Sequence, residues 1–358
     1  MANWLSGYTT RKKITIDYTK IDDDLTDFPV LVKLTSSNFD FSKANSDGFD
    51  VRFTSDNGTT LLKYERERHD ATNKLAEYWV KIPSVSSSAD TDFFIYFRSL
   101  DTDDGADPTN VWDSNFKGVW HMKDLTTSTI EDSTSNNNDG TKGSAGNPTE
   151  ADGKIAKGQN YDANTETIEL GNVLGWERTQ SVTIEAWGKH TTTDKYSQIL
   201  SKQLSSSHQG WSLYKGNNGD GHKLVWLIVN TWTSNAIVKR GSTALNDNTW
   251  HYLVGTYDGS SSANGAKLYV DCVEESYTTV YNSLTASILT SATASIGNRD
   301  TPATLNQGWE GTLDEVRISY VARSSAWIKA SYYSGNNSLV SYGSEEAIIT
   351  NRRRLLII

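Results

Sequence analysis

The chain has 358 residues, of which 36% are hydrophobic, 12 are Trp and 17 are Tyr, and its formal net charge is −10. This length predicts two domains, each large enough to bury a core. The acidic balance argues against sequence-independent DNA binding, which needs Lys and Arg to neutralise phosphates. The single cysteine, Cys272, excludes an intrachain disulfide and argues against a cysteine-based zinc site.

The N-terminal sequence MANWLSGYTTRKK lacks the apolar segment of a secretory signal peptide. No run approaches the ~18 apolar residues that a membrane-spanning helix needs. We therefore expect synthesis in the cytoplasm and no membrane insertion. Action outside the cell would need another route, and release as part of a virus particle is one.

Residues 1–110 show short segments in which apolar and polar side chains alternate. A spacing of two places each apolar set on one face of a sheet. Stretches rich in Ser, Asp, Gly and Pro separate the segments and are typical of turns. The pattern predicts a β-sandwich. The alternating segments are 14–16, 30–34, 51–53, 78–80 and 93–97.

The order of TTRKKITID, DFPVLVKL, AEYWVKIPSVS, FFIYF and NVWD within residues 4–113 resembles a domain of unknown function. That domain often precedes laminin-G-like jelly rolls in prokaryotic surface proteins and phage proteins. The resemblance implies a fold but no chemistry, and we place this domain at residues 1–113. The acidic segment 99–108 is interpreted as a solvated linker. The alternative is a cation-binding loop built from Asp101, Asp103, Asp104 and Asp107.

Seven motifs in residues 116–345 follow one another in the order of a laminin-G/concanavalin A-like jelly roll. The motifs are GVWHMKD, EDSTSNNNDGT, SVTIEAWGK, WHYLVGTYDG, AKLYVDCVEES, SIGNRD and WEGTLDEVRISYVARSSAWIKASY. The chain thus resembles the concanavalin A-like lectin/glucanase superfamily in this part. The resemblance implies an all-β protein, with the N-terminal β-sandwich followed by a jelly roll at 114–345 and a tail at 346–358.

Two segments of the jelly roll allow a local prediction, one of a helix and one of a turn. SSAWIKASYY, after the last strand, predicts a short helix capped by Ser324 or Ser325. Cys272 stands at a hairpin turn where the resemblance commonly has glycine, which adopts positive φ without strain. We therefore expect the turn at Cys272 to be altered.

No motif for catalysis is present. A retaining glycosidase needs two carboxylates on one strand face, and the glucanase pattern Glu-x-Asp-x-Glu does not occur. Glu185 stands alone on its predicted strand, and the adjacent Asp314 and Glu315 point to opposite faces. No HExxH, GxSxG or Walker A sequence occurs. The sequence therefore favours a protein that is not an enzyme.

An oxygen-rich loop suggests a structural Ca²⁺ site. The loop contains Asp132, Asn138 and Asp139, and carboxylate and amide oxygens are the ligands that calcium prefers. The resemblance adds Asp314, since the first and last strands of a jelly roll pair in space. The alternative is an ordinary Asn/Gly turn.

The segment KLVWLIVNTWTS suggests a carbohydrate site. Trp226, Asn230 and Trp232 share one strand face, whereas the other face is aliphatic. If the aliphatic face lies in the core, the two indoles lie on the open side, where flat aromatic rings suit a sugar. Trp211, Tyr214 and Trp309 could join them. The alternative is that these large aromatics are core residues.

The C-terminal tail ends in three arginines and four aliphatic residues. A solvated monomer gains nothing by exposing such side chains, so an assembly contact is one hypothesis. A strand folded onto the protein's own surface is the other. The assembly residues would be Arg352, Arg353, Arg354, Leu355, Leu356, Ile357 and Ile358.

These features favour a carbohydrate-binding or adhesion module on a particle or cell surface, such as a phage virion component. Its expected partners are a glycan and, through the tail, other structural subunits or a second copy. The first alternative is a purely structural protein, such as a capsid decoration or fibre protein, that binds no sugar. The second is a glycan-active hydrolase.

Overall fold

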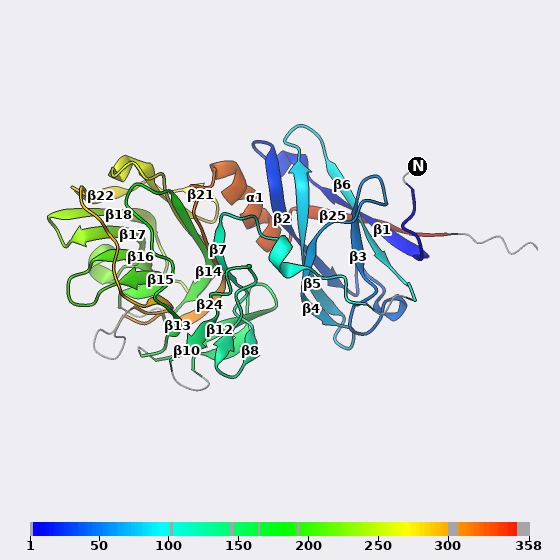
Figure 1. The fold of residues 1–358 in the computed structure, drawn as a ribbon, viewed down its shortest axis with the longest axis horizontal. Helices are drawn as coiled ribbons and strands as arrows, with labels where there is room; N and C mark the ends of the chain where they lie inside the picture. The colour runs from blue at the N-terminus through cyan, green and yellow to red at the C-terminus, as the bar shows by residue number, and fades with distance from the viewer. Residues whose placement is uncertain are drawn as a thin grey trace, which may run out of the picture. The chain divides into compact units, whose positions relative to one another are not determined.

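The computed structural model describes residues 3–100, 103–143, 147–163, 165–191, 194–299 and 307–348 (Figure 1). The chain divides into two compact units. Unit 1 contains residues 1–111 and 337–358, and unit 2 contains residues 112–336. Almost all regular structure in the described residues is β, which confirms the predicted fold class.

Unit 1 is a sandwich of two antiparallel sheets. Phe53 of one sheet lies against Tyr64 and Tyr78 of the other, with ring centroids 5.2 and 5.4 Å apart. The three-stranded sheet has the order β2 (Leu25–Thr35), β5 (Leu75–Val85), β4 (Tyr64–Asp70). The four-stranded sheet has the order β25 (Val340–Ala347), β1 (Thr10–Ile16), β6 (Thr91–Phe97), β3 (Arg52–Ser55).

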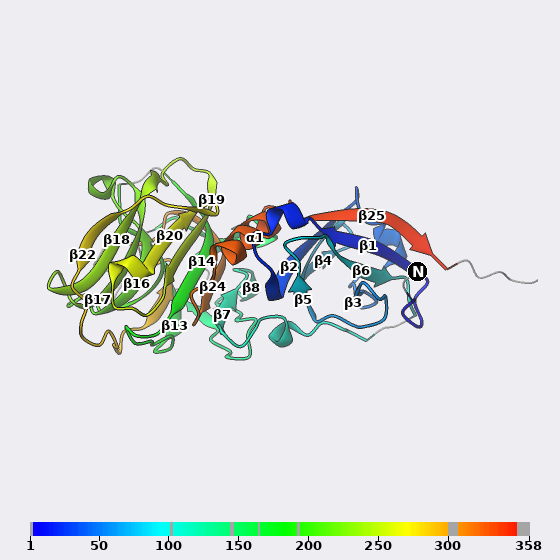
Figure 2. The same cartoon turned by 90° about the horizontal axis from the view of Figure 1, so that it is seen from above.

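Strand β25 comes from the far end of the chain. It pairs antiparallel with β1, with Ile14 opposite Tyr342 and Thr10 opposite Ala347 (Figure 2). The expected jelly roll at 114–345 is therefore too long, because residues 337–345 belong to unit 1. The physical reason is that β1 has two hydrogen-bonding edges. Strand β6 occupies one, and β25 satisfies the other.

Unit 2 contains two large sheets. The ten-stranded sheet has the order β22 (Thr278–Asn282), β18 (Asn235–Ala244), β17 (Lys223–Thr231), β16 (Gly210–Lys215), β15 (Ser197–Gln203), β23 (Ala294–Ile296), β13 (Ile168–Gly171), β10 (Gly140–Lys142), β9 (Thr129–Ile130), β8 (Asp124–Thr126). The eight-stranded sheet contains β11 (Thr149–Asp152), β12 (Lys157–Tyr161), β24 (Gly311–Ser319), β14 (Val182–His190), β19 (Trp250–Tyr257), β20 (Ala266–Val270), β21 (Val273–Glu274) and, beside β24, β7 (Phe116–Trp120).

The core of unit 2 lies between these two sheets. Leu213 and Trp226 of the ten-stranded sheet pack there with Ala186 and Leu253 of the eight-stranded sheet. The indole N–H of Trp226 donates a hydrogen bond of 3.2 Å to the carbonyl of Thr256, across the sandwich. Because side chains alternate along a strand, the neighbours of Trp226 on β17 face outward. They form a separate cluster on the outer face, with members Tyr214, Val225, Leu227, Val229, Ala236 and Val238.

The predicted helix is confirmed as α1 (Ser325–Gly335), and the side chain of Ser324 caps it by accepting from the amide of Trp327. Ile328 of α1 packs on the outer face of the eight-stranded sheet, against Trp187 and Tyr252. No helix in the described residues is long and apolar enough to cross a membrane. The short 3-10 helices are η1 (Tyr18–Lys20), η2 (Phe41–Lys43), η3 (Pro108–Asn110), η4 (Asn218–Asp220) and η5 (Ala263–Gly265).

The turn at Cys272 keeps its backbone shape without glycine. Val270 pairs with Val273, which leaves Asp271 and Cys272 as a two-residue loop. Their φ angles are +50° and +64°, and positive φ at both central residues is the geometry that favours a twisted hairpin. The expected alteration of this turn is therefore wrong, since Cys272 itself adopts the left-handed conformation.

Candidate functional site

The strand face on which the carbohydrate prediction rested is the buried one. Trp226 is 0% exposed, and Trp211 and Trp309 lie in the same core. Placing these three indoles in a sugar site is therefore wrong. Both side-chain sets of β17 are apolar, so alternation alone does not say which set is inside. The large rings fill the space between the sheets, and the smaller aliphatic residues form the outer face.

Asn230, Trp232 and Tyr214 have different surroundings from these core indoles. The side-chain amide of Asn230 donates a hydrogen bond of 2.6 Å to the carbonyl of Ser287. Its nitrogen therefore holds the loop that contains Ser287. Trp232 lies just beyond the end of β17 and is 38% exposed. Tyr214 and Trp232 both line a cleft on the outer face of the ten-stranded sheet.

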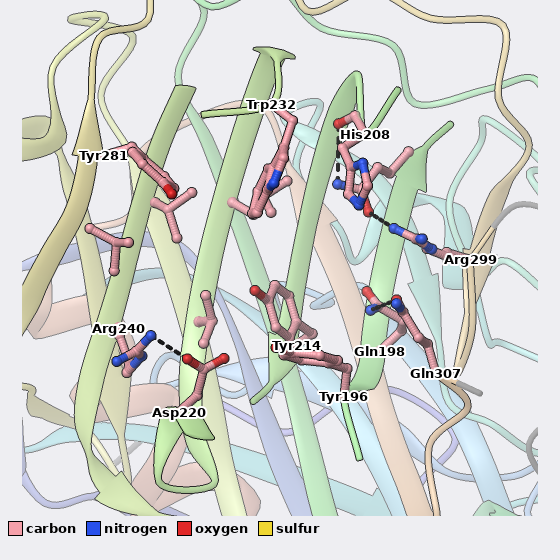
Figure 3. Close-up of a pocket in the computed structure, with 15 residues that line it drawn as sticks. Tyr196, Gln198, His208, Tyr214, Asp220, Trp232, Arg240, Tyr281, Arg299 and Gln307 are labelled. Atoms are coloured by element: carbon pink, nitrogen blue, oxygen red, sulfur yellow. Dashed lines mark hydrogen bonds and ion pairs between the residues drawn. The ribbon is translucent and has the colours of Figure 1, made fainter. Parts of the chain in front are cut away.

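This cleft has a volume of about 320 Å³ and lies over strands β15 to β18 and β22 (Figure 3). Its floor includes Val225 and Leu227 of β17 and Val238 of β18, which are buried and aliphatic. Aromatic, amide and charged side chains form its walls. The floor follows directly from strand alternation, since these residues are the outward set of β17 and β18.

One end of the cleft is built around Trp232. The indole of Trp232 stacks on the imidazole of His208, with centroids 4.9 Å apart and planes 24° apart. The ring of Tyr281 meets the indole edge-to-face at 5.8 Å. Figure 3 shows these three rings on the same side of the cleft. His208 and Tyr281 thus hold the indole in place from two sides.

The opposite end is built around Tyr196 and Tyr214. Their rings meet at 5.9 Å in an edge-to-face arrangement, and Tyr196 is 37% exposed. Asp220 and Arg240 form an ion pair at this end (Figure 3). Asp220 is the last residue of the short helix η4 between β16 and β17, whereas Arg240 lies on β18.

Amide side chains form a third wall. Nε2 of Gln198 donates to Oε1 of Gln307 at 3.1 Å, and Nη1 of Arg299 donates to Oε1 of Gln203 at 2.8 Å. Nε2 of Gln203 in turn donates to the carbonyl of His208 at 3.1 Å, which ties this wall to the Trp232 end. Primary amides carry both donors and acceptors, so the wall suits a ligand with many hydroxyl groups.

The electrostatics of the cleft are mild. Burial, followed by the charge of Arg299, lowers the pKa of His208, so its imidazole is neutral at neutral pH. Burial raises the pKa of Tyr196 and of Tyr214, so both phenols keep their protons and can donate hydrogen bonds. The ion pair of Asp220 with Arg240 balances one charge of each sign.

Sequence reasoning missed most of this cleft. Its walls come from residues scattered between 196 and 307, and no motif links them. One signal in the sequence was usable. If the set with Trp226 had been assigned to the core and the set with Val225 and Leu227 to the outer face, the floor of the cleft would have been predicted. Polar lining residues such as Gln198 and Arg299 lie on or beside separate strands that only the sheet order brings together.

The candidate calcium loop is held by the protein's own donors. The carboxylate of Asp132 accepts from the amides of Val119, Thr134 and Asn138 at 2.9–3.0 Å, and from the hydroxyl of Thr134 at 2.9 Å. Four donors fill the acceptor capacity of a carboxylate. Asp132 therefore does not fit the role of a calcium ligand, and it fixes the loop instead.

The other predicted ligands are also engaged elsewhere. Oδ1 of Asp139 accepts from the amide of Asp132 at 2.8 Å, and Nδ2 of Asn138 donates to the carbonyl of Lys117 at 2.7 Å. Asp314 is buried on β24, where Oδ2 accepts from the amide of Ile155 at 2.8 Å. In the part of the chain that the structure describes, Asp132, Asp139 and Asp314 do not gather into one ligand group. Calcium binding stays a prediction from the sequence.

The buried carboxylates of the eight-stranded sheet are paired as well. Glu185 accepts a hydrogen bond of 2.7 Å from the hydroxyl of Tyr252. Glu315 contacts His121 at 2.7 Å and forms an ion pair with Arg317. Nearby positive charges lower the pKa of Glu315 despite its burial, which by itself would raise it. These carboxylates are therefore engaged by protein groups inside the unit.

Two further predictions concern the ends of unit 1. In the acidic segment, Asp104 binds Arg66 through two hydrogen bonds of 2.6 Å, and Asp107 binds Lys63 at 2.5 Å. These two carboxylates are therefore used within unit 1, while Asp101 lies outside the described residues. The predicted assembly residues 352–358 also lie outside the described residues.

Comparison with known families agrees with this architecture. Residues 162–329 match the model described as the concanavalin A-like lectin/glucanases superfamily. Residues 47–141 match the model described as a domain of unknown function (DUF2341). The predicted order, with this N-terminal domain before the concanavalin A-like domain, is confirmed. A search of curated proteins finds no match.

Several solved structures resemble the chain at low identity. The binding domain of Paraclostridial Mosquitocidal Protein 1 is 15% identical, with a TM-score of 0.46 over 62% of this chain and 52% of that chain. Domain 4 of AbnA, a GH43 extracellular arabinanase from Geobacillus stearothermophilus in complex with arabinotriose, is 19% identical, with a TM-score of 0.39 over 60% and 97%. The Ruminococcus gnavus IT-sialidase CBM40 bound to alpha2,3 sialyllactose is 14% identical, with a TM-score of 0.36 over 46% and 96%. The chain spans about half the length of the toxin binding domain.

Proposed function

We propose that unit 2 is a non-enzymatic carbohydrate-binding module whose glycan site is the cleft between Trp232 and Tyr196. The observation that carries the proposal is the pair of exposed aromatic rings at the two ends of one cleft, with amide and charged side chains between them. The match of residues 162–329 to a lectin/glucanases superfamily supports the same class of ligand.

The chemistry of sugars explains why this surface suits them. A sugar ring has an apolar face of C–H groups and an edge of hydroxyl groups. The phenol of Tyr196 and the part of the Trp232 indole that His208 leaves uncovered offer apolar aromatic surface to a ligand. The amides of Gln198 and Gln307 can donate to and accept from hydroxyl groups. A few polar groups over an aliphatic floor are also the usual make-up of small-molecule sites.

The charges in the cleft favour binding over hydrolysis. Glycosidases place two carboxylates on either side of the scissile bond, about 5–5.5 Å apart in retaining enzymes and about 6.5–9.5 Å apart in inverting ones. Among the described residues that line the cleft, Asp220 is the one carboxylate, and it is paired with Arg240. A single carboxylate whose charge is already balanced is a poor acid or base for this reaction.

We also propose that the module acts in adhesion at the surface of a particle, such as a virion, or of a cell. In this proposal unit 2 contacts the glycan and the C-terminal tail contacts a neighbouring subunit. A purely structural protein without sugar binding is the competing function, and the following experiment distinguishes the two.

The test is a glycan array probed with the full chain and with Trp232→Ala. We expect binding to at least one class of glycan and its loss in the variant. Tyr18→Ala is the matched control, because Tyr18 is 40% exposed but belongs to unit 1. An array without binding, or binding that Trp232→Ala leaves unchanged, would reject the site. Release of reducing sugar from the bound glycans would reject the non-enzymatic part.

A further inference from the structure

We infer that the cleft holds an oligosaccharide of at least two sugar units, laid along β17 with one unit at the Tyr196 end and one at the Trp232 end. This inference rests on the proposed function, since it specifies the size and direction of the glycan. Its basis is that the cleft has two separate aromatic platforms rather than one (Figure 3).

The register of the sheet separates the two platforms. Tyr214, which packs against Tyr196, lies opposite Val225 at the start of β17. Trp232 follows Val225 by seven residues, just past the end of the same strand. The two platforms therefore lie at different positions along β17 rather than side by side. The side chains turn toward one cleft from its opposite ends (Figure 3).

Each platform has its own polar groups. At the Tyr196 end, the ion pair of Asp220 with Arg240 offers both acceptors and donors. At the Trp232 end, His208 supports the indole, and Arg299 lies beside the Gln203 amide. An aromatic face combined with planar polar groups is a complete set for holding one sugar. The cleft therefore contains two such sets.

Among the described residues, the floor between the platforms has no side-chain group that could form a hydrogen bond with a sugar hydroxyl. Val225, Leu227 and Val238 are aliphatic and offer no side-chain donor or acceptor. This apolar stretch suits the link between two sugars, where hydroxyl groups have been consumed in the glycosidic bond. The volume of about 320 Å³ also falls in the range of roughly 300–1,000 Å³ for sites that take drug-sized ligands.

Calorimetric titration of the full chain tests the inference. The probes are the mono-, di- and trisaccharide fragments of the glycan that gives the strongest array signal. We expect the disaccharide to bind about tenfold or more tightly than the monosaccharide, since a second buried contact of hot-spot quality is worth at least that factor. This comparison uses the unmodified protein and does not depend on the folding of any variant.

Variants at the two ends provide the second measurement. Trp232→Ala and Tyr196→Ala should each reduce disaccharide affinity to about the level of the monosaccharide. Monosaccharide binding should respond strongly to one of the two variants only, because one sugar occupies one platform. Tyr18→Ala should change neither affinity.

The outcomes separate the inference from the function on which it rests. If none of the array glycans binds, the proposed function itself fails. If a glycan binds but the monosaccharide matches the disaccharide in affinity, the function stands and the two-platform inference is wrong. The same conclusion follows if only one of the two aromatic residues affects disaccharide binding.

Discussion

The indole of Trp232 and the imidazole of His208 stack at 4.9 Å on the outer face of the ten-stranded sheet. Six residues earlier, Trp226 is buried in the core of the same unit. Two indoles from one short sequence segment thus have opposite environments. One contributes to the stability of the fold, and the other is available to a ligand.

Alanine substitutions at these two tryptophans should therefore have opposite effects. Trp226→Ala removes a fully buried indole and should lower the free energy of unfolding by about 3–5 kcal/mol. Trp232→Ala removes a partly exposed ring and should lower it by about 1 kcal/mol or less, while glycan binding is lost. Urea denaturation and the glycan array measure the two quantities. Equal losses of stability in both variants would contradict the assignment of faces.

Strand β25 should be needed for the stability of unit 1. The hydroxyl of Tyr342 donates a hydrogen bond of 2.8 Å to the carbonyl of Lys33. Just before β25, Leu339 is buried, and full burial of a side chain of this size stabilises the fold by about 1.5–3 kcal/mol. Deleting residues 337–358 should therefore lower the melting temperature of unit 1 and expose the amides of β1 to hydrogen exchange. The strands of unit 2 should keep their protection.

A shorter deletion is the matched control for β25. Removing residues 349–358 leaves all of β25 in place, so hydrogen exchange in β1 should match that of the full chain. If the tail makes the proposed assembly contact, this truncated protein should also remain monomeric where the full chain assembles. Equal protection of β1 in both truncations would show that β25 is dispensable, and equal assembly would reject the role of the tail.

Asp132 should stabilise unit 2 without an ion. Asp132→Ala leaves the amides of Val119, Thr134 and Asn138 without their acceptor, at a cost of about 1–3 kcal/mol for each one that stays buried. Because the donors are protein groups, we expect the same loss of stability in calcium and in chelator. Thermal melts in the two buffers measure it. A loss seen only with calcium would show that Asp132 acts through a bound ion.

His251 should make the stability of unit 2 depend on pH. Its hydrogen bond of 2.7 Å to Asp271 is the main cause of a pKa raised above the ordinary value of 6.5. Since the folded-state pKa is the higher one, this contribution is fully present below about pH 6.5 and is lost as the pH rises through the folded-state pKa. Asp271→Asn should reduce it, because the side chain loses its charge, while Asp247 keeps its contact of 3.2 Å with His251.

The difference in unfolding free energy between the wild type and Asp271→Asn should therefore be largest at acidic pH and should shrink as the pH rises. Asparagine tolerates the left-handed backbone at this position, where φ is +50°, so the turn should survive. Urea titrations across the pH range measure the difference. A difference that does not change with pH would mean that the charge of His251 has no part in it.

The sequence by itself determined the local elements of this protein. Alternation of apolar side chains predicted the strands of both units, and the two serines that open SSAWIKASYY predicted the capped helix α1. These features depend on near neighbours in the chain, because strand alternation and helix capping are set within a few residues. The order of motifs was also sufficient for the two families that the chain resembles.

Only the tertiary structure decided which face of β17 is buried, since both of its side-chain sets are apolar and each could fill a core. It also decided that β25 pairs with β1, more than 300 residues away in the chain, and that Tyr196, Asp220 and Trp232 line one cleft. The physical reason is common to all three. A local pattern specifies that a surface must be covered or an edge must be paired, but the partner is chosen by the packing of the whole sheet.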